Sequence, residues 1–128
     1  MNCRTKLILF PAVETLLFVA ASLTHAGILL SGHEHGRAAT AEGVIGAVLA
    51  LGLIASLMRK APAPVLALAV QGFALLGTLA GAFTIAVGVG PRTAADLIFH
   101  AILLLVLIVG TVAAWATWRK PPRRSTPA

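Results

Sequence analysis

Four long apolar segments separated by short polar connections dominate the chain. They span residues 7–30, 41–58, 65–89 and 97–118. A helix of roughly 20 apolar residues is long enough to cross the hydrocarbon core of a bilayer, since each residue adds about 1.5 Å. The pattern therefore predicts an all-α, integral membrane protein with four membrane-spanning helices.

The connections between these segments are short and rich in turn-forming residues. The first is bracketed by Gly32 and Gly36, the second contains the stiff run 61–64, and the third contains Gly90 and Pro91. Short connections place consecutive helices antiparallel to each other. We therefore expect an up-down-up-down four-helix bundle over residues 1–118.

The composition agrees with a membrane class and with a single domain. Hydrophobic residues make up 59% of the chain and charged residues 11%, whereas soluble domains carry about 25% charged residues. No room remains for a separate soluble domain. The sequence also contains no complete catalytic or phosphate-binding motif, which makes an enzyme the least favoured class.

The basic residues are distributed unevenly over the predicted connections. Only Arg37 and Arg92 lie in the first and third connections. The other eight flank the opposite ends of the segments: Arg4, Lys6, Arg59, Lys60, Arg119, Lys120, Arg123 and Arg124. Because cytoplasmic loops carry the excess of Lys and Arg, both termini are predicted to be cytoplasmic.

The tail over residues 119–128 is basic and rich in proline. It has nothing to bury, so we expect it to be disordered and to contact anionic lipid. It contains no aromatic side chain on which bases could stack, which argues against a nucleic-acid partner. The Ala-rich composition, with more Arg than Lys, indicates a bacterial source, so we expect a multi-pass protein of the inner (plasma) membrane.

The first segment also resembles a secretory signal peptide in its basic start and apolar run. The run is longer than the usual apolar region of a signal peptide, and it contains Pro11 and Glu14. We therefore favour a retained first helix over a cleaved one.

Six candidate ligand residues gather in the outer half of the predicted bundle: His25, His33, His35, Glu42, Asp96 and His100. His25 and His100 lie roughly 8 and 9 Å from the outer ends of their segments. Asp96 is one helical turn from His100 on the same face. We expect His25 and His100 to face the bundle interior close to each other, because an imidazole facing lipid would be left without a hydrogen-bond partner.

Three interpretations compete for this cluster, and its cofactor stays unknown at this stage. Imidazoles and carboxylates are suitable ligands for a transition metal such as Zn or Cu. His25 and His100 could instead hold a b-type haem between helices. The third interpretation is hydrogen bonding within the bundle, with Asp96 acting as a helix cap, and neither cofactor is favoured over none. Proton coupling or an organic ligand such as a quinone are further alternatives.

Glu14 is the one acidic residue predicted to lie in the inner half of the membrane. No Lys or Arg falls within any span to pair with it, so we expect an inward-pointing, neutral carboxyl at pH 7. Gln71 and Thr111 lie at similar depth and are its candidate hydrogen-bond partners. Glu14 and His25 share one face of their helix, which would permit a proton path, although two separate hydrogen bonds need fewer assumptions.

Small residues at four-residue spacing predict close helix contacts. Gly77 and Gly81 form a GxxxG pattern, which favours packing within the bundle and alternatively a contact with other membrane subunits or a second copy. Together these features predict a non-enzymatic accessory or structural membrane component. The alternative is a metal- or haem-binding protein for redox chemistry or ion handling.

Overall fold

The structure is a computed structural model that describes residues 2–59 and 63–119. In that part of the chain it contains four α-helices: α1 (Cys3–His25), α2 (Gly36–Met58), α3 (Pro64–Ala86) and α4 (Ala94–Trp118). Each is long and apolar enough to span a membrane, and the shortest have 23 residues. At about 1.5 Å per residue this length exceeds a hydrocarbon core of about 30 Å. The predicted all-α class is confirmed, and the four helices indicate a multi-pass membrane protein.

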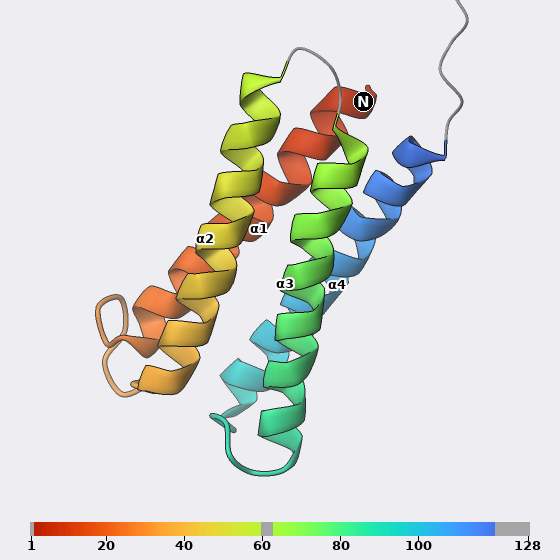
Figure 1. Ribbon diagram of the computed structural model, residues 1–128. Helices are drawn as coiled ribbons and strands as arrows, with labels where there is room; N and C mark the ends of the chain where they lie inside the picture. Colours follow the sequence, from red (N-terminus) through yellow and green to blue (C-terminus); the bar gives the residue numbers. More distant parts are fainter. Residues whose placement is uncertain (1, 60–62, 120–128) are drawn as a thin grey trace, which may run out of the picture.

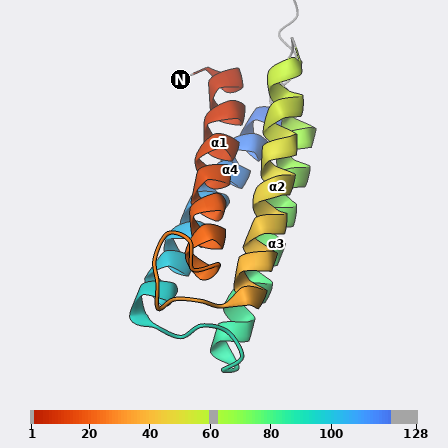
Figure 2. The ribbon, with the colours of Figure 1, turned by 90° about the vertical axis from the view of Figure 1, so that its left-hand side faces the viewer.

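The helices form a ring in chain order. α1 packs against α2 and α4, and α3 also packs against α2 and α4. Figure 2 shows α1 and α4 on one side of the molecule and α2 and α3 on the other. The α1–α2 and α3–α4 loops lie at one end, which we call the loop end, and the N-terminus lies at the opposite, N-terminal end (Figure 1). At the N-terminal end, Arg4 donates a hydrogen bond to the backbone oxygen of Arg59 at 3.3 Å.

α1 and α3 end before the apolar segments that predicted them. The predicted spans reach residues 30 and 89, whereas the helices end at His25 and Ala86. Gly27 and Gly88 follow these ends with φ of +74° and +85°. In each case the N–H of the glycine and the next N–H bond carbonyl oxygens of the last turn at 2.9–3.1 Å. This glycine-terminated cap stops a helix whatever the hydropathy of the residues that follow.

α1 and α2 begin before their apolar segments, because polar residues cap them. Asn2 accepts a hydrogen bond from the N–H of Thr5 at 2.7 Å. His35 accepts from the N–H of Ala38 at 3.3 Å. For α4, Thr93 and Asp96 form a capping box, in which each side chain accepts a hydrogen bond from the backbone N–H of the other residue.

The helices expose large apolar side chains and bury polar ones, which is the reverse of the pattern in a soluble protein. The most exposed side chains of the helices include Leu16, Leu51 and Leu76, with 66–70% exposure. Glu14 and Gln71, in contrast, are 0% and 1% exposed. A surface of large apolar side chains around buried polar ones suits a bilayer as solvent, because lipid penalises unsatisfied polar groups and not exposed leucines.

The helices approach each other closely where glycine replaces a side chain. A Cβ on Gly46 of α2 would lie 3.3 Å from Phe18 of α1, and one on Gly77 of α3 would lie 2.8 Å from Ile45 of α2. A Cβ on Gly81 would lie 3.6 Å from His100. Both glycines of the GxxxG pattern therefore face other helices of the same chain. The apolar core between the helices includes Phe18, Leu49, Leu103 and Leu107.

Two predicted features fall outside the described residues. The disordered tail was predicted over 119–128, of which only Arg119 is described. The inner turn was predicted at 61–64, of which residues 61 and 62 are not described.

Candidate functional site

Three ionisable side chains join three helices at the loop end. The Nδ1 atom of His25, the last residue of α1, lies 2.7 Å from Oε2 of Glu42 on α2. Its Nε2 atom lies 3.3 Å from Oδ1 of Asp96 on α4. The three residues are only 4%, 5% and 7% exposed, respectively. We call them the loop-end network.

Local structure at the helix ends orients this network. Asp96 lies in the first turn of α4, where the helix dipole favours negative charge, and His25 ends α1, where the dipole favours positive charge. The Oδ2 atom of Asp96 accepts hydrogen bonds from the N–H and hydroxyl of Thr93 at 3.0 and 2.6 Å. The other oxygen of the carboxyl is thereby left for His25. The backbone N–H of His35 donates to the carbonyl oxygen of His25 at 2.8 Å, so the connecting loop returns over the end of α1.

The contacts of His25 set the minimum number of protons in the network. A carboxylate oxygen can only accept, so two hydrogen bonds need a protonated imidazole between two carboxylates, or a neutral imidazole with one carboxyl protonated. These two arrangements hold the fewest protons that allow both hydrogen bonds, and each carries one net negative charge. Within residues 2–59 and 63–119, neither Glu42 nor Asp96 forms a salt bridge to a Lys or Arg.

His100 lies beside the network without bonding to His25. Its Nδ1 atom donates to the backbone oxygen of Asp96 at 2.9 Å. In the neutral ring, Nε2 is then a free acceptor, and it points toward Gly81 of α3. His25 and His100 therefore contact the same residue, Asp96, from two sides. His25 is the last residue of α1, and His100 lies in the second turn of α4.

The loop residues have roles apart from the network. His35 caps α2. The Nδ1 atom of His33 is buried without a hydrogen-bond partner, beside a cavity of about 310 Å³ that His25 and Asp96 also line. Glu34 is exposed, and the N–H of Gly32, which donates to its carboxylate at 2.9 Å, lowers the pKa of that group. Glu34 thus carries a negative charge at neutral pH.

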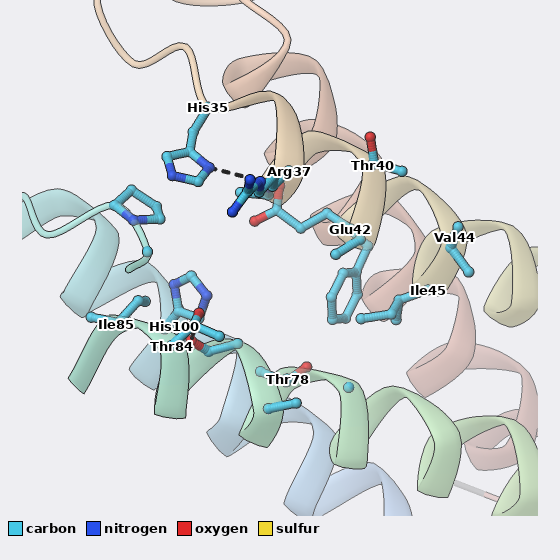
Figure 3. A pocket seen from close by; sticks show the side chains of 18 of the residues that line it. His35, Arg37, Thr40, Glu42, Val44, Ile45, Thr78, Thr84, Ile85 and His100 are labelled. Atoms are coloured by element: carbon cyan, nitrogen blue, oxygen red, sulfur yellow. Dashed lines mark hydrogen bonds between the residues drawn. The ribbon is translucent and has the colours of Figure 1, made fainter. Parts of the chain in front are cut away.

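A larger cavity of about 790 Å³ lies between α2 and α3 near the loop end. Glu42 from α2 and His100 from α4 both line it, together with His35 and Arg37 (Figure 3). The remaining wall is mostly apolar. The Oε1 atom of Glu42 is buried and has no hydrogen-bond partner. A residue of the loop-end network that lines the cavity therefore has an unsatisfied polar atom.

A separate polar pair lies nearer the middle of the bundle. The Nε2 atom of Gln71 on α3 donates to Oε1 and Oε2 of Glu14 on α1 at 2.9 and 3.1 Å. Of the two partners considered from the sequence, Gln71 therefore fills the role, while the hydroxyl of Thr111 is buried without a partner. Gly110 of α4 lies against the pair, and a Cβ there would collide with both Glu14 and Gln71.

The structure thus brings together four of the six predicted cluster residues: His25, Glu42, Asp96 and His100. Among the described residues, it holds no group of three or more His, Cys, Asp or Glu side chains arranged to bind a metal ion. Sequence reasoning did not find the contact of Gly110 with the buried pair. A lone glycine in the middle of an apolar helix was the available signal. No family model, curated protein or solved structure matches the chain.

Proposed function

We propose that the chain is a non-enzymatic, multi-pass membrane protein, an accessory or structural component, in which the loop-end network holds α1, α2 and α4 together. One observation carries the proposal: both ring nitrogens of His25 are already engaged by carboxylates from two other helices. A metal ion or haem iron needs a free imidazole nitrogen, and His25 has none in this arrangement. Removing one partner of a buried ionic network is strongly destabilising, which is the behaviour of a structural element.

The proposed topology is an up-down-up-down bundle with both termini in the cytoplasm of a bacterial cell. The N-terminal end of the structure, with Arg4 and Arg59, is the more basic one, which supports placing it inside. Trp115 and Trp118 pack together at 4.9 Å, and the guanidinium of Arg119 lies 5.2 Å from the Trp115 ring. Aromatic rings beside a cation are typical of a membrane–water interface. Reporter fusions should be active in the cytoplasm at Ala128, and the loop around His35 should be labelled from outside.

The structural role is tested by comparing two histidine variants. His25→Ala leaves two buried carboxylates without their shared partner and should cost about 3–5 kcal/mol of unfolding free energy. His33→Ala is the matched control, because the Nδ1 atom of His33 has no hydrogen bond to lose, and it should change stability by less than about 1 kcal/mol. Unfolding of detergent-purified protein by added SDS would measure both. Equal stability of the two variants would refute the role of the network.

The alternative is a metal- or haem-binding protein that uses the same cluster. It would require His25 to release a carboxylate so that a ring nitrogen becomes free. The absorption spectrum and metal content of the purified protein decide between the two. A Soret band or stoichiometric metal, lost in His25→Ala, would replace the structural proposal.

A further inference from the structure

The cavity between α2 and α3 has a lining that suits a ligand of defined chemistry. Its volume of about 790 Å³ lies within the range of about 300–1,000 Å³ typical of small-molecule sites. Its walls include the outward-facing apolar side chains of Val44 and Phe73, so an apolar molecule can reach it from the acyl-chain region. The apolar part of a ligand that enters from the bilayer would therefore move from one apolar environment, the acyl chains, into another, the cavity.

The lining contains both acceptors and donors: Arg37 and the Nε2 of His35, whose Nδ1 accepts from Ala38, carry N–H groups, whereas the groups around Glu42 are acceptors. Glu42, 5% exposed, presents Oε1 without a partner. His100 presents Nε2, since its Nδ1 donates to Asp96. The hydroxyl of Thr84 donates to the backbone oxygen of Gly81 at 2.7 Å, which leaves its oxygen free only to accept. A ligand head group that reaches Glu42, His100 and Thr84 must therefore supply hydrogen-bond donors.

The charge of the loop-end network favours a cationic hydrogen-bond donor over a neutral one. With the fewest protons that keep both hydrogen bonds of His25, the loop-end network carries one net negative charge, and within the described chain no Lys or Arg neutralises it through a salt bridge. Arg37 lines the cavity but is exposed, where solvent screens its charge. When the imidazole of His25 is protonated, Glu42 is ionised, and a carboxylate in an apolar cavity is stabilised most by a cation that also donates hydrogen bonds.

We propose that this cavity binds a lipophilic primary amine in its protonated form, with the ammonium at Glu42 and His100 and the alkyl part between α2 and α3. A primary ammonium has three donors, which matches the acceptors presented by Glu42, His100 and Thr84. At pH 7 an alkylamine is protonated as the Lys side chain is. The site is separate from the structural role of His25, because it uses the oxygen of Glu42 that His25 does not contact.

The test is equilibrium binding of radiolabelled octylamine to the protein in nanodiscs of zwitterionic lipid, with empty nanodiscs as background. We expect saturable binding that unlabelled octylamine displaces and that octanol and octanoate do not. Glu42→Gln should weaken binding by about tenfold or more, equivalent to about 1.4 kcal/mol. Glu34→Gln removes one negative charge from the exposed loop and is the matched control, so its affinity should stay within about twofold.

A second pair of variants keeps the test decisive if Glu42→Gln fails to fold. Ala80→Phe adds a ring at the cavity wall while Glu42 remains in place. Leu76→Phe adds a ring on the exposed face of α3, outside the lining. Loss of octylamine binding in Ala80→Phe alone supports the site. Unchanged binding in Ala80→Phe, equal displacement by octanol, or an equal loss in Glu34→Gln would each overturn the proposal.

Discussion

Gly110→Ala should destabilise the protein although the same change normally stabilises a helix. A methyl group at Gly110 would occupy the space taken by the Glu14 carboxyl and the Gln71 amide. Both groups end flexible side chains, so relieving the collision itself costs little. They are, however, 0% and 1% exposed, and the Gln71 amide nitrogen donates to both Glu14 oxygens. Moving either group away breaks the buried pair.

The expected size of the effect follows from three contributions. Replacing a helical glycine by alanine stabilises by about 0.8–1.0 kcal/mol. Loss of an interhelical hydrogen bond in a membrane costs about 0.6–1.7 kcal/mol. A buried polar group left without a partner costs roughly 1–3 kcal/mol more. The sum is a net destabilisation of about 1–4 kcal/mol, opposite in sign to the helix propensity.

Gly72→Ala on α3 is the matched control, because a Cβ there meets nothing within 4 Å. It should be neutral or stabilise by up to about 1 kcal/mol. Unfolding of purified protein by SDS in mixed micelles measures both variants. In a Glu14→Ala background, the cost of Gly110→Ala should largely disappear, as expected for coupled residues. The reasoning is refuted if Gly110→Ala is as stable as Gly72→Ala, or if its cost is unchanged in that background.

Two further predictions concern buried contacts and use the same unfolding measurement. Glu14→Gln keeps an oxygen that accepts from Gln71 and adds an amide that can donate to the unpartnered Gln71 Oε1, so stability should change by less than about 1 kcal/mol, whereas Glu14→Leu should cost up to about 2 kcal/mol. Failure of Glu14→Gln to fold would show that the charged carboxylate is structurally required. A Cβ on Gly52 would lie 2.6 Å from the Val70 side chain, so Gly52→Ala should destabilise by about 1–3 kcal/mol. A Gly52→Ala variant as stable as Gly72→Ala would mean that α2 and α3 are not in such close contact.

Much of the local structure could be predicted from the sequence. The four helices follow from the lengths of the apolar segments, and the α4 capping box follows from the spacing of Thr93 and Asp96. The predicted ends of α1 and α3 are less accurate, because the apolar residues continue past Gly27 and Gly88. Those glycines adopt positive φ, and their place at the loop could have been recognised only by giving turn chemistry more weight than hydropathy.

The partners of the polar side chains were decided by the tertiary structure. The sequence by itself determined that Glu14 and the outer histidines and acids must find partners, because a bilayer offers none. It could not choose Gln71 over Thr111, assign both nitrogens of His25 to Glu42 and Asp96, or place Gly110 against the buried pair. Those outcomes depend on how each helix is rotated and where it crosses its neighbours. Rotation and crossing come from packing between segments distant in the chain, whereas helix length, polarity and caps come from residues that are adjacent in it.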